Sequence, residues 1–277
     1  GLPWTVATPV AEMLNSANMA FALCPLLNQG SIELLSTHGT AQQKAVYLRK
    51  MISGEWTGTM NLTEPQAGSD LGLLTTRAEP EGGHYRIRGQ KIFITWGEHD
   101  MAANTIHMVL ARRCVSIEHK LGINASPTCV MAYGDNDGAI GFLVGRENRG
   151  LEAMFTMMNN ERMGVGLQGV AIAERAFQQA RDYARQRMQG RDLRGGRETV
   201  PIVRHPDVKR MLLTMKAGID AIRALTYYTA AQMDRAKQGD GDAQARVDVL
   251  TPVVKAWNTD LGCEIASLGV QVHGGMG

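Results

Sequence analysis

The sequence has little of what marks a disulfide-stabilised or metal-binding protein. Its 277 residues include four cysteines, and no two of them form a Cys-x-x-Cys pair. The seven histidines show no His-x-x-x-His or His-Glu-x-x-His spacing that would place two ligands on one face of a helix. We therefore expect no metal site, and we expect buried, free cysteines in a reducing compartment at positions Cys24, Cys114, Cys129 and Cys263.

Long apolar runs and an excess of one charge are also missing. No apolar run approaches the ~18 residues that span a bilayer, and the N-terminus lacks the basic-then-apolar design of a signal peptide. A net charge of +2 favours neither nucleic acid nor a membrane surface as a partner, although a basic segment runs from Arg181 to Arg210. The sequence thus predicts a cytoplasmic protein.

The periodicity of the apolar residues predicts an α+β protein with three parts. Residues 1–56 have a helical period, and short helices fit them better than one long helix. Residues 57–147 switch to a period of two with many turn signals, which predicts a β domain with antiparallel pairing. Residues 148–277 predict a bundle of long helices.

Individual elements follow from the same signals. Thr40 to Gln43 reads as a capping box that opens a helix. Strands are expected at 57–62, 74–78, 84–88, 91–95, 105–112, 128–133 and 139–144, and long helices at 151–189, 207–237 and 243–272.

The stretch from Met60 to Asp70 carries the clearest signal for a ligand. A short apolar run enters it, Pro65 fixes the backbone, and Gly68-Ser69-Asp70 can present free N–H groups to an anionic or heteroaromatic ligand. The alternative is a plain surface turn, because Thr-Glu-Pro and Gly-Ser-Asp are both common turn sequences.

A second motif, Gly89-Gln90-Lys91-Ile92-Phe93-Ile94-Thr95, follows this loop. Together the two resemble the acyl-CoA dehydrogenase family, whose middle domain carries a T-E-P-x-A-G-S-D loop and then a G-x-K-x-F/W-I-T strand. Within the family, the segments 120–123 (Lys-Leu-Gly-Ile) and 126–129 (Ser-Pro-Thr-Cys) are most similar to the branch that includes 3-methylmercaptopropionyl-CoA dehydrogenases. The sequence begins at Gly1 without methionine and ends inside a family motif, so we expect a piece of a longer protein.

The resemblance implies an enzyme with bound FAD that removes hydrogen from the α and β carbons of an acyl-CoA. A base takes the α-proton and hydride passes to flavin N5. It also implies an electron-transfer flavoprotein as acceptor and a homodimer or homotetramer. Residues implied in FAD binding are Met60, Leu62, Thr63, Gly68, Ser69, Phe93, Ile94, Thr95, Arg187, Gln189, Gln271, Gly274 and Gly275. Residues implied in substrate binding are Ser69, Asn159 and Arg162.

Glu161 is the candidate catalytic base. A glutamate beside Arg162 on an apolar helix is either a solvated ion pair or a tuned acid/base group. The resemblance favours the second interpretation, because isovaleryl- and long-chain-type members place their base here. Other members take it from a later Y-E-G-T-like segment that this sequence lacks, and in that alternative the base lies beyond Gly277.

Three other interpretations compete with this one. Gly164-x-Gly166-x-x-Gly169 matches the dinucleotide-binding pattern, but no strand precedes it, so we interpret these glycines as helix-packing residues. Acyl-CoA oxidases and nitroalkane-type flavoenzymes share the fold and use oxygen as acceptor. A flavin-containing, DNA-binding alkylation-response protein would need the basic segment from Arg181 to Arg210 as a binding surface.

Overall fold

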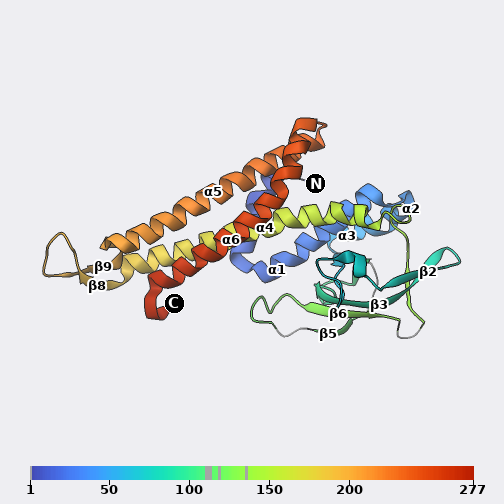
Figure 1. Ribbon diagram of the computed structural model, residues 1–277, viewed down its shortest axis with the longest axis horizontal. Helices are drawn as coiled ribbons and strands as arrows, with labels where there is room; N and C mark the ends of the chain where they lie inside the picture. The colour runs from blue at the N-terminus through green and yellow to red at the C-terminus, as the bar shows by residue number, and fades with distance from the viewer. Residues whose placement is uncertain (1, 110–113, 118–119, 135–136) are drawn as a thin grey trace. The chain divides into compact units, whose positions relative to one another are not determined.

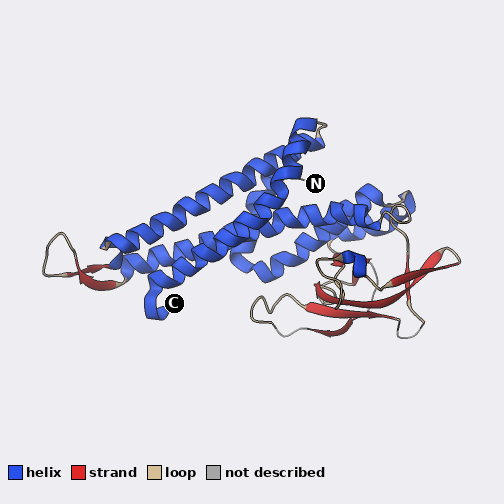
Figure 2. Cartoon of the chain, viewed as in Figure 1, coloured by secondary structure: helices blue, strands red, loops and turns tan. Residues whose placement is uncertain are grey.

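The computed structural model describes residues 2–109, 114–117, 120–134 and 137–277. They form two compact units, one of residues 1–18 and 162–277 and the other of residues 19–161. Helices α1 (Trp4–His38) and α4 (Gly150–Gln186) contribute to both units. Strands are concentrated in the 19–161 unit and long helices in the other (Figure 2). The α+β class is confirmed, whereas the three-part domain division stays a prediction.

The 19–161 unit contains most of the described strands. The strands are β1 (Trp56–Asn61), β2 (Arg77–Glu81), β3 (His84–Thr95), β4 (Asn104–Val109), β5 (Cys114–Ile117), β6 (Thr128–Tyr133) and β7 (Ala139–Gly141). In the main sheet, β3 lies between β2 and β6, and β5 lies on the other side of β6 (Figure 1). β7 also pairs with β3, and all of these pairs are antiparallel.

Several strand expectations were wrong. β1 and β4 pair in parallel, because the β2–β3 hairpin and its flanking loops separate them and bring the chain back in the same direction. The segments 84–88 and 91–95 form one strand, β3, that continues through a bulge. β5 was not expected, and β2 lies three residues later than predicted. The end of the strand predicted at 105–112 lies outside the described residues.

Helices at the start of this unit follow their sequence signals. Thr40 Oγ1 accepts a hydrogen bond from Gln43 N at 3.2 Å, and Gln43 Oε1 accepts one from Thr40 N at 2.9 Å, which confirms the capping box. It opens α2 (Ala41–Gln43), a π-helical turn η1 (Lys44–Leu48) and α3 (Arg49–Ser53), which Gly54 ends at φ = 80°. These elements pack on a core that includes Leu34, Leu35, Met51, Leu62, Trp96 and Met157.

α1 differs from the short helices that were expected. It runs for 35 residues and is broken by non-helical backbone at Asn18. By length and composition α1 could cross a membrane, which the sequence analysis did not anticipate, but a helix in a protein core passes the same test. The part of α1 in the 19–161 unit supplies buried Ala22, Leu27 and Leu35 to the core.

Described cysteine side chains differ in exposure. Cys24 and Cys129 are buried, as expected, whereas Cys263 is exposed, and none of the three forms a disulfide. The expectation of four buried cysteines was therefore wrong for Cys263, which faces outward from a helix. The side chain of Cys114 lies outside the described residues.

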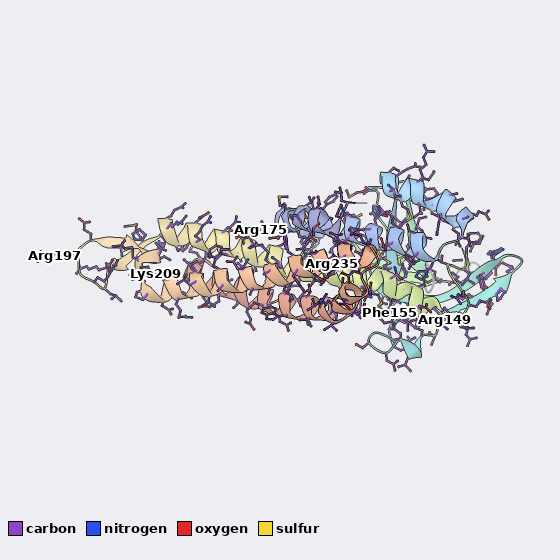
Figure 3. The ribbon with its side chains drawn as sticks, turned by 90° about the horizontal axis from the view of Figure 1, so that it is seen from above. Arg149, Phe155, Arg175, Arg197, Lys209 and Arg235 are labelled. Carbon is purple, nitrogen blue, oxygen red and sulfur yellow. The ribbon has the colours of Figure 1, made fainter. Side chains whose placement is uncertain are left out.

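The other unit is built on α4, α5 (Pro206–Lys237) and α6 (Gly241–His273), close to the three helices predicted. α5 begins on Pro206, and Asp240 caps α6 by accepting from Ala243 N at 3.0 Å. α5 and α6 run side by side (Figure 1). An unpredicted hairpin, β8 (Met188–Arg191) and β9 (Thr199–Pro201), has Arg197 at its tip (Figure 3). Short 3₁₀ turns are η2 (Leu71–Leu73), η3 (Ile202–Arg204) and η4 (Gly274–Met276).

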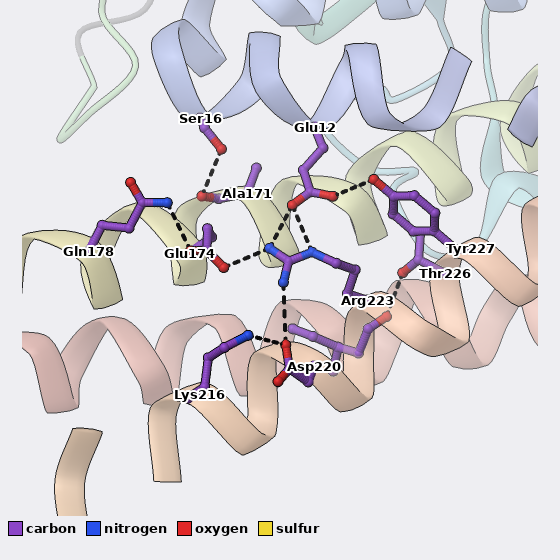
Figure 4. Close-up of polar contacts among 11 residues, drawn as sticks. Glu12, Ser16, Ala171, Glu174, Gln178, Lys216, Asp220, Arg223, Thr226 and Tyr227 are labelled. Atoms are coloured by element: carbon purple, nitrogen blue, oxygen red, sulfur yellow. Dashed lines mark hydrogen bonds and ion pairs between the residues drawn. The ribbon is translucent and has the colours of Figure 1, made fainter. Parts of the chain in front are cut away.

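A charged network joins three segments of this helical unit (Figure 4). Arg223 on α5 donates to Glu12 Oε1 at 2.7 Å and to Glu174 Oε2 on α4 at 2.7 Å. Tyr227 OH donates to the other Glu12 oxygen at 2.8 Å. Burial and this hydrogen bond raise the pKa of Tyr227 to about 12. The network holds the first turns of α1 against α4 and α5.

The glycine pattern 164–169 is confirmed as a helix-packing feature. It lies inside α4, and a Cβ atom on Gly169 would stand 2.2 Å from the carbonyl oxygen of Asn258 on α6. A Cβ atom on Gly262 of α6 would stand 2.9 Å from the carbonyl oxygen of Gly169, so the two helix backbones touch where neither residue has a side chain. A dinucleotide site needs a strand before the glycines, and here a helix precedes them.

We expect Gly169→Ala to lower the free energy of unfolding by about 1–3 kcal/mol, because the added methyl overlaps backbone that cannot rotate away. Gly150→Ala, on the same helix, is the matched control, since nothing lies within 4 Å of its added methyl. Urea denaturation of both variants measures the difference. Equal stability of the two would contradict close packing at Gly169.

Candidate functional site

The loop after β1 is a defined turn fixed to β3. Glu64 and Ala67 exchange two backbone hydrogen bonds, with N to O distances of 2.9 and 3.0 Å. Thr63 O accepts from Ile92 N of β3 at 2.9 Å. Asp70 Oδ1 accepts from Gly72 N at 2.9 Å and thereby ends the loop on η2. The two sequence motifs therefore lie side by side in the folded unit.

A buried ion pair connects the two motifs. Lys91 Nζ lies 2.8 Å from Glu64 Oε1 and donates to Leu62 O at 2.7 Å. Lys91 is 0% exposed and Glu64 2%. Glu64 also accepts from Thr75 N at 2.8 Å and Thr76 N at 3.2 Å. One carboxylate thus holds the start of the loop, β3 and the chain before β2.

This environment keeps Glu64 ionised. Burial alone would raise the pKa of Glu64, but hydrogen bonds from Lys91, Thr76 and Thr75 outweigh burial and hold that pKa well below its usual range. Because each carboxylate oxygen has donors, the desolvated charge is compensated at several points. The ion pair fixes the position of the loop and is itself covered, so it is not available to a ligand.

Phe93 has the most unusual backbone in this region. It adopts φ = 59° at the bulge between Lys91 and Ile94, and its side chain is 60% exposed. A left-handed conformation is costly for an aromatic residue and is concentrated at functional sites. The bulge turns Phe93 outward while Ile94 remains in the sheet core.

The other residues predicted to bind FAD differ in how exposed they are. The side chains of Leu62 and Ile94 are buried in apolar cores, so these two residues can contact a ligand only through their backbone atoms. Gly68 and Ser69 are exposed at the end of the loop. Within the described residues, the hydroxyls of Thr63 and Thr95 make no hydrogen bond, although both backbones are fixed. An outward aromatic ring and two available hydroxyls fit a flat heteroaromatic cofactor such as a flavin.

A second predicted group lies together at one end of the helical unit. Tyr183 near the end of α4 stacks on His273 near the end of α6, with ring centroids 4.6 Å apart. Arg187 and Gln189 follow the first of these helices. Residues 271–275, with Gln271, Gly274 and Gly275, end the second. All five predicted residues are exposed.

Glu161 lies within α4. Its Oε1 atom is buried and has no hydrogen-bond partner among the described residues. Burial raises the pKa of Glu161 to about 8. Of its neighbours, Asn159 is exposed and Arg162 is half-buried. A carboxyl with this pKa can accept a proton near neutral pH, which an ordinary glutamate does poorly.

The sequence analysis assigned no role to Glu64 or Lys91. Alternation along β3 places Lys91 on the same face as Ile87. An apolar face indicates burial, and a buried lysine needs a partner for its charge, so the sequence did contain a signal for this pair. The acidic residue of the Thr-Glu-Pro turn was the nearest candidate. For metals, the described residues contain no group of three or more potential ligands.

Comparison with known proteins identifies the two halves of the chain. The family model for the acyl-CoA dehydrogenase middle domain matches residues 59–159. The model for the C-terminal domain of the same family matches residues 148–277. Together they cover the β strands, α4 and the helical bundle.

The curated proteins that are similar to this chain include several acyl-CoA dehydrogenases. 3-Methylmercaptopropionyl-CoA dehydrogenase of Ruegeria pomeroyi is 48% identical over 316 aligned positions, which cover 100% of this chain and 53% of that protein. Butyryl-CoA dehydrogenase of Syntrophomonas wolfei is 33% identical, over 97% of this chain and 52% of that protein. The chain spans about half the length of these relatives.

Solved structures agree with this assignment. Butyryl-CoA dehydrogenase of Megasphaera elsdenii superimposes with a TM-score of 0.81 at 25% identity, over 96% of this chain and 70% of that one. A chain from the electron transferring flavoprotein structure of Acidaminococcus fermentans has a TM-score of 0.84 at 24% identity, over 99% of this chain and 73% of that one, and shows the fold alone. With both family models matched in order along one fold, the chain belongs to the acyl-CoA dehydrogenase family.

Proposed function

We propose that this chain is part of an FAD-dependent enzyme that introduces a double bond between the α and β carbons of an acyl-CoA thioester. The Glu161 carboxyl carries the proposal. It is the group with a buried, unpartnered oxygen and a pKa raised into the working range of a base. In the proposed reaction, Glu161 removes the α-proton of the thioester.

The cofactor in this proposal is FAD, which would supply the acceptor for the hydride of the β carbon. Thr63 and Thr95 would donate hydrogen bonds to it, and Phe93 would cover its ring. Gly68 and Ser69 would offer backbone and hydroxyl donors to phosphate oxygens or to the CoA part of the substrate. The Glu64–Lys91 pair supports this role because it holds both motifs in place.

The exposed end of the helical unit supports an assembly. The predicted residues at this end, Arg187, Gln189, Gln271, Gly274 and Gly275, are exposed and offer side-chain and backbone donors. In this proposal they reach the FAD of a neighbouring subunit, which requires at least a dimer. The electron acceptor would be an electron-transfer flavoprotein, and the enzyme would act in the cytoplasm on a short thioester such as those in the names of the relatives.

The basic segment favours this function over DNA binding. Arg181 pairs with Asp182, Arg210 pairs with Asp207, and Asp192 holds both Arg194 and Arg204. These four ion pairs with carboxylates neutralise part of the charge of the segment. A phosphate backbone would have to compete with these internal partners.

Anaerobic titration tests the proposal. The FAD-loaded protein is mixed with 3-methylmercaptopropionyl-CoA, butyryl-CoA and longer thioesters while flavin absorbance is recorded. We expect at least one thioester to bleach the flavin, and we expect slow reoxidation by air. Failure of every thioester to reduce the flavin would reject the dehydrogenase function. Rapid, stoichiometric peroxide release would identify an oxidase instead.

A further inference from the structure

Two aromatic residues with a left-handed backbone enclose the end of β3. Phe93 has φ = 59° and Trp96 has φ = 52°, so Ile94 and Thr95 lie between two residues in a conformation that is costly for a large side chain. Such conformations persist where the surrounding contacts fix them, and they are concentrated at functional sites. Phe93 and Thr95 belong to the candidate flavin site, whereas the proposed function assigns no role to Trp96.

Trp96 is anchored through both its backbone and its side chain. Its backbone N donates to Pro127 O at 2.7 Å, which continues the register of the β3–β6 pair. Its indole Nε1 donates to Ala20 O of α1 at 3.2 Å. Trp96 is 3% exposed and belongs to the core that includes Leu62. Together these contacts offset the cost of the left-handed backbone.

His99 packs against the indole ring of Trp96. The two rings meet edge to face, with centroids 5.0 Å apart and an interplanar angle of 79°. Burial lowers the pKa of His99, so the imidazole is neutral at pH 7. His99 Nδ1 accepts from Met101 N at 3.2 Å, so the ring proton lies on Nε2, which donates to Thr57 Oγ1 of β1 at 2.9 Å. The imidazole that packs on Trp96 is therefore itself held by β1.

The peptide group that joins Thr95 to Trp96 is hydrogen-bonded at both ends. Thr95 O accepts from Thr59 Oγ1 at 2.6 Å, and the N–H of the same peptide group is the one that Trp96 donates to Pro127. The hydroxyl of Thr95, in contrast, makes no hydrogen bond within the part of the chain that the structure describes. A hydroxyl on an immobilised backbone with no internal partner is preorganised to donate to a ligand.

We propose that Trp96 is a positioning residue for the flavin, because its anchored indole holds the Thr95 hydroxyl where it donates a hydrogen bond to the flavin ring. The Trp96 side chain is buried, so it acts through Thr95 and not by contact with the cofactor. The inference rests on the proposed function, since it needs a bound flavin. Loss of the indole anchor and loss of the Thr95 hydroxyl should therefore have the same consequence for flavin binding.

A double-variant cycle on FAD affinity tests this role. Trp96→Phe keeps an aromatic ring but removes the Nε1 donor, Thr95→Val removes the hydroxyl but keeps the shape, and the third protein carries both changes. FAD is removed from each protein and titrated back while flavin fluorescence is recorded, and the visible absorption maximum of the bound flavin is a second readout. Trp56→Phe is the matched control, because Trp56 packs against the same core and lies outside the candidate flavin residues. If Trp96→Phe does not fold, His99→Asn, which removes the edge-to-face contact, replaces it in the same cycle.

We expect Trp96→Phe and Thr95→Val each to raise the dissociation constant of FAD by about 3- to 10-fold, the contribution of one hydrogen bond. In the Thr95→Val background, Trp96→Phe should change that constant by less than about 2-fold, because the hydroxyl it positions is absent. Both single variants should shift the absorption maximum in the same direction, and Trp56→Phe should change neither quantity. If the two single effects multiply in the double variant, Trp96 has only a structural role and the inference is wrong while the proposed function stands. If the unsubstituted chain does not bind FAD, the proposed function fails and this inference fails with it.

Discussion

Lys91→Met should be among the most damaging single substitutions in this chain. It leaves the Glu64 carboxylate buried without its cation, and breaking a buried pair from one side typically costs about 3–5 kcal/mol. Methionine fills a volume similar to that of the lysine side chain, so cavity formation adds little. We expect the free energy of unfolding to fall by about that amount in urea denaturation at pH 7.

The pH dependence separates this charge effect from a packing effect. The folded-state pKa of Glu64 lies below its unfolded value, so its contribution to stability is present above about pH 4.3 and is lost as pH falls further. Without Lys91 the carboxyl protonates more readily. The stability gap between the native chain and Lys91→Met should therefore be largest at pH 7 and narrow below pH 4. A gap that stays constant with pH would mean that packing, not charge, was lost.

A matched substitution keeps this result interpretable. Lys50 also pairs with a glutamate, Glu55, at 2.8 Å, but the two side chains are 41% and 51% exposed. Exposed pairs contribute at most about 1 kcal/mol, so Lys50→Met should change stability little. A similar loss in both variants would indicate a general effect of removing lysine.

The helices were the part of the fold most readily predicted from sequence. Long amphipathic segments with a clear start, such as the one that begins on Pro206, carry many repeats of the same period. The strand pairing was harder, because partners are set by contacts between distant residues. Nothing within residues 56–61 or 104–109 indicates that β1 and β4 are parallel. The single strand β3 was predicted as two segments separated by Gly89 and Gln90, whereas Gly89 lies inside the strand at φ = 148°, against Thr76.

The two sequence motifs predicted which residues belong to the candidate site, but not how their side chains are arranged. The resemblance named Thr63, Phe93 and Thr95, but a motif does not show which side chains face outward. The bulge at Phe93 separates an exposed aromatic ring from the buried Ile94, and only three-dimensional structure reveals it. The Glu64–Lys91 pair was missed because its residues are 27 positions apart and neither looked unusual alone.

Glu161→Gln should slow flavin reduction by acyl-CoA by about 10²- to 10⁴-fold, the range that a positioned general base contributes. Glutamine has nearly the same shape, so binding of the thioester should change much less than the rate. Stopped-flow absorbance of the FAD-loaded protein under anaerobic conditions measures the reduction step. Glu152→Gln, an exposed glutamate on the same helix that pairs with Arg149, is the matched control and should react normally.

The raised pKa of Glu161 gives the same prediction a dependence on pH. With a pKa of about 8, the carboxyl is mostly protonated at pH 7, so the reduction rate should rise as pH increases through about 8. The pKa of Glu161 is higher in the folded state than in the unfolded state. The contribution of Glu161 to the free energy of unfolding is therefore fully present below about pH 4.3 and is lost as pH rises to about 8. Glu161→Gln should lack both changes. If Glu161→Gln reduces the flavin normally and with an unchanged pH profile, the base is another residue. If that variant reacts normally but its stability no longer changes between pH 4.3 and pH 8, Glu161 is buried as a protonated acid without acting as the base.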